Sequence, residues 1–302
     1  MKTFYSHGKL LISGEYLVLD GASALALPTR YGQSMTVESI DSAEILWISR
    51  DNKGITWYDA GFDISKNQSI TSRKHDGVTK TIIKLFEEAI TLNPQFLKEA
   101  TGYKISCRLE FPQDWGLGSS STLINNFAQW AEVDPFELSD RTLGGSGYDI
   151  ACAQSDSAII YRRTNRKPQI ETVSFDPVFK EHLYFVHLNK KQDSREAISV
   201  YSELDKEIGI NIPKIDELTK LMVNCTELNE FISLIERHEQ IMSEILKRPT
   251  VRDIHFSDFQ GGLKSLGAWG GDFILVASET EPADYFSEKG FTTIIPYEEM
   301  VL

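Results

Sequence analysis

The sequence predicts an α+β protein of two domains, and three observations support this fold class. The chain has 302 residues, enough for two domains that each bury a core. Its first part contains short strand-like stretches separated by Gly or Asp, and its later part contains two long amphipathic helical patterns. A polar, basic stretch at residues 162–168 interrupts the apolar pattern. We therefore expect one domain over residues 1–170 and a second over residues 171–302.

Apolar runs and alternation predict the strands of the first domain. Residues 9–21 hold two apolar runs on either side of Gly14 and close on an Asp-Gly turn signal, which favours two adjacent strands. Apolar and polar residues alternate over 103–111, as in a half-buried strand. Together with further strands expected at 34–40, 44–49 and 55–58, this describes a mostly antiparallel sheet.

Helical periodicity appears in both halves of the chain. Apolar residues recur at helical spacing over 78–90, and 122–131 also reads as a helix. Residues 151–161 indicate either a helix or a helix followed by a strand. In the second domain, 215–225 and 228–246 suggest an antiparallel helix pair with Thr226 as a cap between them. Strands are expected at 182–188, 273–277 and 292–296, the last two around a polar helix.

Composition excludes several classes of function. The net charge of -13 argues against nucleic-acid binding, which needs an extended basic surface. The N-terminus lacks an apolar stretch of signal-peptide type and no apolar run reaches 18 residues, so we expect a cytoplasmic protein with no membrane partner. Cys107, Cys152 and Cys225 show no metal or disulfide spacing and are expected to be buried free thiols. We expect His238, on the apolar face of a helix, to be a core-edge residue.

A glycine-serine loop at residues 116–121 joins a predicted strand to a predicted helix. Glycines let a phosphate approach the backbone closely, and the positive end of a helix dipole favours an anion. A tight turn with serine caps explains the same six residues equally well. The loop is not a GxxxxGK[ST] motif, the second domain has no His-Arg-Asp signature, and Ser121 stands where a dinucleotide fold would want glycine.

Four ordered segments decide between these alternatives: residues 8–19, 112–121, 145–151 and 264–273. Together they resemble the motifs of the GHMP kinases, the superfamily of galactokinase, homoserine kinase, mevalonate kinase and phosphomevalonate kinase. The resemblance spans most of the chain. It implies a two-domain GHMP kinase-like architecture, in which the N-terminal lobe resembles domain 2 of ribosomal protein S5 and the C-terminal lobe is a ferredoxin-like α/β sandwich.

The resemblance also implies site residues. Asp149 matches the aspartate that orients the substrate hydroxyl and accepts its proton, and Lys9 matches the lysine that stabilises the developing charge. A helix-capping aspartate and a solvated lysine are the structural alternatives. The ATP phosphates would be bound by the loop residues Gly116, Leu117, Gly118, Ser119, Ser120 and Ser121. Of these, Ser120 matches the Mg²⁺-binding serine, whereas Ser119 and Ser121 would contact phosphate or cap the helix.

A second Mg²⁺ ligand is less well defined. The family often places a glutamate ahead of the catalytic aspartate, and Glu137 is the nearest candidate. Its spacing is short for that role, so a surface glutamate is the preferred interpretation. The expected cofactors are ATP and Mg²⁺.

The acceptor side of the reaction is marked by departures from the family motifs. Tyr16 stands where mevalonate kinases tend to have histidine, and Tyr16 with Tyr148 looks more like phosphomevalonate kinase. Ser6-His7 replaces the usual Ala-Pro. Of the three glycine-rich segments, at residues 8–19, 112–121 and 264–273, the third is interrupted by Trp269. The residues expected to bind the acceptor are Glu15, Tyr16, Tyr148, Ser194, Arg195 and Gly270; Ser194 and Arg195 lie in a loop that also reads as merely solvated and charged.

The expected function is ATP-dependent phosphorylation of a small anionic metabolite, phosphomevalonate first and mevalonate second, in isoprenoid precursor synthesis. A kinase for a sugar or for an amino acid such as homoserine is one alternative. A non-catalytic nucleotide-binding regulator is the alternative from another class. The protein is expected to be a monomer or homodimer.

Overall fold

The computed structural model describes residues 1–65, 68–98, 102–192, 194–204 and 208–302. The chain divides into two compact units, each of which is built from three segments that are separated in the sequence. The first unit comprises Met1–Gly8, Tyr31–Gln113 and Gly118–Gln154, and the second comprises Lys9–Arg30, Asp114–Leu117 and Ser155–Leu302. The division at residue 170 stays a prediction. Contacts group residues 9–30 with the second unit, because the long strands β1 and β2 supply residues to both units. Residues 155–170 also belong to the second unit, where β7 pairs with the start of β2.

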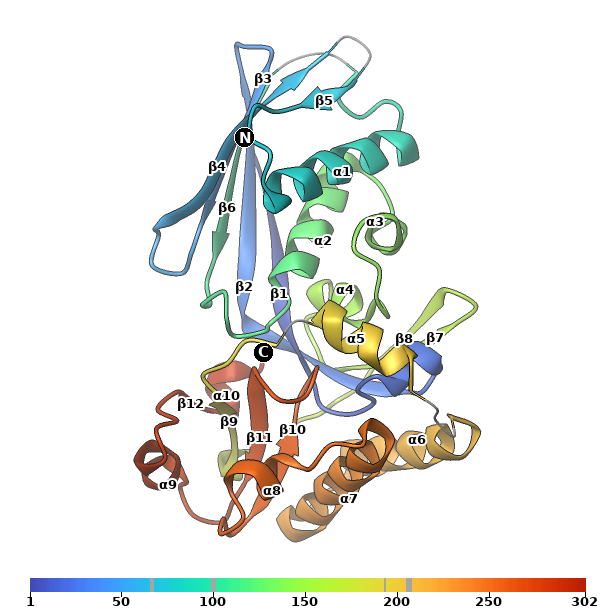
Figure 1. Cartoon of the computed structure of the whole chain (residues 1–302), viewed down its shortest axis with the longest axis vertical. Helices are drawn as coiled ribbons and strands as arrows, with labels where there is room; N and C mark the ends of the chain where they lie inside the picture. The colour runs from blue at the N-terminus through green and yellow to red at the C-terminus, as the bar shows by residue number, and fades with distance from the viewer. Residues whose placement is uncertain (66–67, 99–101, 193, 205–207) are drawn as a thin grey trace. The chain divides into compact units, whose positions relative to one another are not determined.

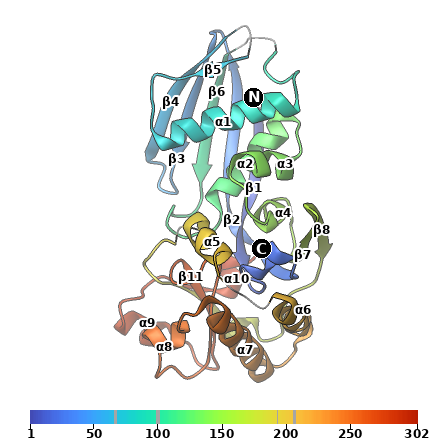
Figure 2. The same ribbon diagram turned by 45° about the vertical axis from the view of Figure 1, so that its right-hand side comes forward.

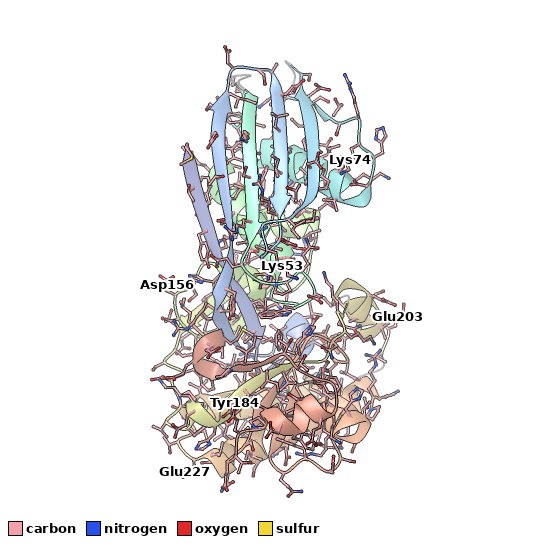
Figure 3. The ribbon with its side chains drawn as sticks, turned by 90° about the vertical axis from the view of Figure 1, so that its left-hand side faces the viewer. Lys53, Lys74, Asp156, Tyr184, Glu203 and Glu227 are labelled. Carbon is pink, nitrogen blue, oxygen red and sulfur yellow. The ribbon has the colours of Figure 1, made fainter. Side chains whose placement is uncertain are left out.

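A mostly antiparallel sheet with strand order β5-β4-β3-β6-β2 forms the first unit, and β1 pairs with β2. The β3–β6 pair is parallel, whereas the β2–β6, β3–β4 and β4–β5 pairs are antiparallel. Figure 3 shows these strands with Lys53 in the β3–β4 turn and Lys74 between β5 and α1. The strands are β1 (Lys2–Leu11), β2 (Ala24–Ile40), β3 (Glu44–Arg50), β4 (Thr56–Ile64), β5 (Ile70–Thr71) and β6 (Gly102–Leu109).

Helices cover one face of this sheet (Figures 1 and 2). The core between the layers is aromatic: Phe86 and Phe127 have ring centroids 5.0 Å apart, and both lie against Trp47. Asp76 begins the first helix by accepting a hydrogen bond from the Thr79 N–H at 2.8 Å. The helices are α1 (Gly77–Leu92), α2 (Ser119–Ala131), α3 (Pro135–Thr142) and α4 (Tyr148–Ala153).

The second unit contains a four-stranded antiparallel sheet with strand order β10-β11-β9-β12. In the same unit the start of β2 pairs with β7, and β7 pairs with β8. The strands are β7 (Ile159–Thr164), β8 (Lys167–Thr172), β9 (Leu183–His187), β10 (Gly262–Ser265), β11 (Phe273–Ala277) and β12 (Ile294–Pro296). The helices are α5 (Ser194–Ser202), α6 (Ile208–Asn224), α7 (Leu228–Leu246), α8 (Val251–His255), α9 (Ala283–Glu288) and α10 (Tyr297–Met300), with 3₁₀ turns η1 (Leu17–Asp20) and η2 (Lys180–His182).

The α+β class is confirmed, but two local predictions are wrong. The second apolar run of residues 9–21 forms η1 and not a strand, because the chain turns at Gly14 (φ 83°) and again at Tyr16 (φ 59°). Thr226 does not cap α7: Glu227 occupies the cap position, with no side-chain hydrogen bond to the helix. The segment 151–161 is a helix followed by a strand. The three cysteines are free and buried, as expected.

Among the described residues, none of the helices combines the length and the apolar character that crossing a lipid bilayer requires.

Candidate active site

The glycine-serine loop ends at a helix whose cap residue supplies no side chain. Gly118 stands at the cap position of α2 with φ 85°, and the Thr122 hydroxyl bonds the Ser119 carbonyl at 3.0 Å rather than an N–H group. The first intrahelical bond runs from the Thr122 N–H to the Gly118 carbonyl at 3.0 Å. The N–H groups of residues 119–121 therefore have no acceptor within the helix, and the helix dipole adds positive potential. This end of α2 can bind an anion.

The third serine of the loop is bonded to the predicted catalytic aspartate. Ser121 is buried and its hydroxyl donates a hydrogen bond to Asp149 Oδ2, both within the first unit. Asp149 is half-buried in the first turn of α4, where its other oxygen accepts the Ile150 N–H at 3.1 Å. Gly147, and not Asp149, occupies the cap position of α4. The hydroxyl of Ser121 is thus used to hold the aspartate, a role that sequence reasoning did not assign to it.

Lys9 lies in the second unit and contacts the other half of the loop. Its ammonium group donates to the Gly116 carbonyl at 2.9 Å, and its backbone N–H donates to the Leu117 carbonyl at 3.1 Å. The side chain is half-buried, which differs from the alternative of an ordinary solvated lysine. Lys9 therefore fixes the backbone of Gly116 and Leu117 directly.

Asp272 is a candidate site residue that sequence reasoning missed. It follows Gly270 and Gly271 in the third glycine-rich segment, is 8% exposed, and has φ 55°. Its Oδ1 accepts the Gln192 N–H at 3.2 Å, and burial raises the pKa of its carboxyl group while the nearby charge of Lys9 lowers it. An aspartate directly after two glycines was the available signal, but nothing in the sequence placed it against residue 116.

Gly116 leaves no room for a side chain beside this carboxylate. It has φ 65°, and a Cβ at this position would lie 2.2 Å from the Asp272 Cγ. Gly116→Ala is therefore expected to displace the loop and to weaken binding of ATP, the nucleotide that the sequence motifs predict, on the order of 100-fold. Titration with ATP measures this. Gly54→Ala is the matched control, because Gly54 has φ 81° but open space around it; equal affinity for ATP in both variants would contradict the argument.

Two predicted acceptor-binding residues are buried and bonded within the second unit. Glu15 is fully buried and its Oε1 forms an ion pair with the ammonium group of Lys264. Burial raises the pKa of Glu15 and the charge of Lys264 opposes that rise. Tyr16 is also buried, and its hydroxyl donates to the Ala268 carbonyl at 2.6 Å. These contacts join the first and third glycine-rich segments.

His238 and Glu239, neighbours on α7, complete this buried cluster. The Gly14 N–H donates to His238 Nε2 at 3.1 Å, and that nitrogen lies 3.3 Å from Glu15 Oε2. His238 is fully buried rather than at the core edge, and burial holds its pKa well below the ordinary value. Glu239 accepts hydrogen bonds from the Ser265 N–H at 2.9 Å and the Ser265 hydroxyl at 2.8 Å. Both glycine-rich segments are thus anchored to one helix.

No protein-family model and no curated protein matches the sequence. Among solved structures, Streptococcus pneumoniae phosphomevalonate kinase in complex with phosphomevalonate and AMPPNP matches with a TM-score of 0.73 and 15% identity, over 97% of this chain and 99% of that chain. Methanococcus jannaschii mevalonate kinase matches with a TM-score of 0.69 and 15% identity, over 96% and 94% of the two chains. Lactococcus lactis galactokinase complexed with galactose matches with a TM-score of 0.66 and 13% identity, over 95% of this chain and 88% of that chain.

The chain has the GHMP-kinase fold.

Within the GHMP-kinase fold, the remaining predicted residues differ in their surroundings. Ser120 is exposed in the first turn of α2. Glu137 lies in the first turn of α3 with a 60% exposed side chain, 3.7 Å from Arg141, which agrees with a surface ion pair. Tyr148 is half-buried as the first residue of α4.

The expected acceptor loop is described only in part. Ser194 and Arg195 begin α5, but their side chains lie outside the described ones. Gly270, with φ 85°, lines a pocket in the second unit together with Lys190 and Gln192.

Proposed function

We propose that the chain is an ATP-dependent kinase that transfers the γ-phosphoryl group to phosphomevalonate or mevalonate. The observation that carries the proposal is the hydrogen bond from Ser121 to Asp149. It joins an uncapped, anion-binding helix end to a carboxylate that can bind a hydroxyl group. A turn with a purely structural role would not need a carboxylate held beside the start of the helix.

The donor side is proposed to bind at the start of α2. Phosphate oxygens would accept hydrogen bonds from the N–H groups of residues 119–121, and Gly118, which has no side chain, allows the close approach. Phosphoryl transfer depends mainly on positioning and on neutralising charge, so a rigid loop is an advantage. The bonds from Lys9 to the carbonyls of Gly116 and Leu117 supply that rigidity.

Asp149 and Lys9 are proposed to act on the acceptor. Asp149 would orient the acceptor hydroxyl and take its proton, with the Ser121 hydroxyl fixing the orientation of the carboxylate. Lys9 would stabilise the charge that develops on the transferred group. A phosphate acceptor is already largely ionised near neutrality. Asp149 would then serve mainly to position the acceptor rather than to remove a proton from it.

Mg²⁺ is expected with ATP, where it would neutralise charge on the phosphates. The exposed hydroxyl of Ser120 in the first turn of α2 fits an oxygen ligand. Glu137 fits less well, because its carboxylate faces Arg141 and a guanidinium competes with a cation. The described residues contain no cluster of three acidic, histidine or cysteine side chains suited to a metal ion.

The choice of acceptor rests on the phosphomevalonate-kinase-like residues Tyr16 and Tyr148 and on fold similarity to a phosphomevalonate kinase bound to phosphomevalonate. Galactokinase has the same fold, so a sugar or amino-acid kinase is the second candidate. A non-catalytic regulator is disfavoured by the retention of Lys9 and Asp149.

A coupled ADP-release assay tests the proposal with four acceptors: phosphomevalonate, mevalonate, homoserine and galactose. We expect Mg²⁺-dependent turnover with phosphomevalonate or mevalonate and none above background with the other two. Turnover of galactose or homoserine alone would show that the acceptor is a sugar or an amino acid instead. ATP binding without turnover of any acceptor would contradict the proposed kinase activity.

A further inference from the structure

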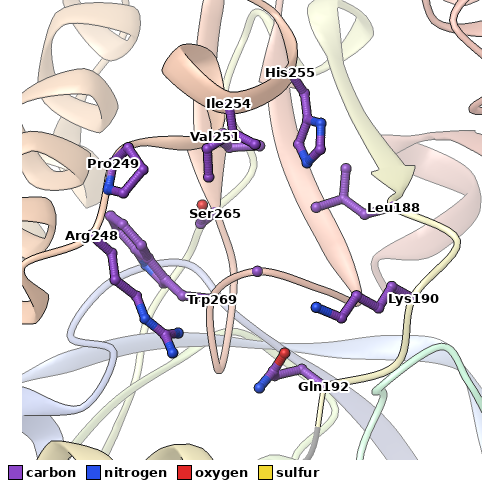
Figure 4. A pocket seen from close by; sticks show the side chains of 11 residues that line it. Leu188, Lys190, Gln192, Arg248, Pro249, Val251, Ile254, His255, Ser265 and Trp269 are labelled. Carbon is purple, nitrogen blue, oxygen red and sulfur yellow. The ribbon is translucent and has the colours of Figure 1, made fainter.

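A cavity of about 420 Å³ lies wholly in the second unit, between the loop that follows β9, the start of α8 and the third glycine-rich segment. Figure 4 shows its labelled side chains around a common space. Most of its lining residues were not singled out by the sequence motifs. The exceptions are Ser265, Trp269 and Gly270, which belong to the segment at residues 264–273.

The polar part of the lining is basic. Lys190, Arg248 and His255 all contribute side chains, and no described residue that lines the cavity is acidic. None of the three forms an ion pair with another described residue, although the protein as a whole carries a net charge of -13. Lysine and arginine that no carboxylate neutralises, gathered at one cavity of an acidic protein, favour an anionic ligand.

Apart from Gln192, Ser265 and Gly270, the remaining wall is apolar, and it contains a donor without a partner among the described residues. Leu188, Val251 and Ile254 supply aliphatic surface, and Trp269 supplies an aromatic ring that is 3% exposed. The indole Nε1 of Trp269 is buried and has no hydrogen-bond partner among the described residues. A buried N–H without a partner costs free energy, so a ligand that supplies an acceptor would recover it.

Backbone contacts fix the shape of the cavity. The Asp272 N–H donates to the Lys190 carbonyl at 2.6 Å, and a Cβ at Gly271 would lie 2.7 Å from that same oxygen. Ser265 is held by Glu239 through its hydroxyl at 2.8 Å. The loop with Lys190 and the segment with Trp269 are thus locked together before any ligand binds, which limits the entropy cost of binding.

We propose that this cavity binds an organic anion whose carboxylate or phosphate lies against Arg248 and Lys190 and whose carbon chain lies against Trp269. The ligand is either the phosphoryl acceptor, in which case the inference rests on the proposed function, or a small anion that does not react. Both sources share the same chemistry. Arg248 offers a bidentate fork to either anionic group, and Lys190 a mobile point charge.

Calorimetric titration of the full chain, without ATP, tests the cavity independently of catalysis. The probes are phosphomevalonate, mevalonate and the uncharged mevalonolactone. We expect the two anions to bind, the lactone not to bind, and Arg248→Gln to weaken anion binding by about tenfold or more. Arg237→Gln, an exposed arginine on α7 away from the cavity, is the matched control and should bind as the wild type does.

Tryptophan fluorescence locates the bound anion. Phosphomevalonate should change the emission of the wild type, and Trp269→Phe should lose that change while a circular dichroism spectrum shows the fold retained. Steady-state kinetics then separate the two sources. A raised KM for the acceptor in Arg248→Gln, with KM for ATP unchanged, identifies the acceptor as the ligand; weakened anion binding with an unchanged acceptor KM identifies a non-reacting anion.

Two outcomes would overturn the inference: wild-type protein that binds neither anion, or Arg248→Gln and Arg237→Gln that bind both equally well. The second outcome leaves the proposed function untouched. Absence of turnover would count against the kinase, but the calorimetric result would still decide the cavity.

Discussion

Asp149→Asn should lower kcat for mevalonate by about 100- to 10,000-fold, the range typical of losing a general base. Asparagine can still accept the hydrogen bond from Ser121, so the geometry of the loop is expected to persist while proton acceptance is lost. Phosphomevalonate needs less proton abstraction, so its kcat should fall less. Steady-state kinetics with both acceptors measure the difference.

Asp63→Asn, which changes an exposed carboxylate on β4 of the same unit, is the control and should leave kcat unchanged. Ser121→Ala should fall between the two variants, because the aspartate remains but loses the donor that orients it. An Asp149→Asn enzyme with wild-type kcat for both acceptors would remove Asp149 from the mechanism.

Lys264→Met should destabilise the fold by about 3–5 kcal/mol, the range for removing one partner of a buried ion pair. Lys264 and Glu15 are both fully buried, so the variant leaves a carboxylate without its counter-charge. Urea denaturation measures the loss. Lys220→Met on the exposed side of α6 is the control, with little change expected.

The loss in Lys264→Met should depend on pH. Burial already raises the pKa of Glu15, and removing Lys264 removes the charge that opposes the rise. The folded variant then binds a proton that the unfolded chain releases above its ordinary carboxyl pKa, so stability falls as pH increases toward the folded pKa. Denaturation at pH 5.5 should therefore show a smaller loss than at pH 8.

The double variant Glu15→Gln/Lys264→Met separates charge from packing. Removing both charges should restore part of the stability, because the fully buried side chain at position 15 no longer carries a charge without its partner. A double variant less stable than Lys264→Met at every pH would show that packing dominates at this position.

Periodic segments were predicted from the sequence because a repeating pattern records one buried face. The 228–246 pattern matches α7 and the 273–277 pattern matches β11, residue for residue. Residues 17–20 are an exception: Leu17 and Val18 are buried in a 3₁₀ turn, and burial alone does not report the direction of the backbone. Where φ is positive, as at Tyr16, the pattern carries no information about the turn.

The residues of the candidate site also fall into those that the sequence revealed and those that it did not. The loop at 116–121 and Asp149 were visible as motifs, since their chemistry is local. The ion pair between Glu15 and Lys264 joins residues 249 positions apart, and no periodicity encodes such a distance. Asp272 and Arg248 were likewise invisible, because their importance comes from what folding places beside them.

The second unit combines residues 9–30 with residues from the other end of the sequence, and this has a consequence for synthesis of the protein. Residues 28 and 29, made early, pair with residues 302 and 301: the Leu302 N–H donates to the Pro28 carbonyl at 3.1 Å, and Thr29 forms a bridge with Val301. These contacts cannot form until residues 301 and 302 have left the ribosome. Residues 28 and 29 therefore acquire these partners only after about 270 further residues have been made.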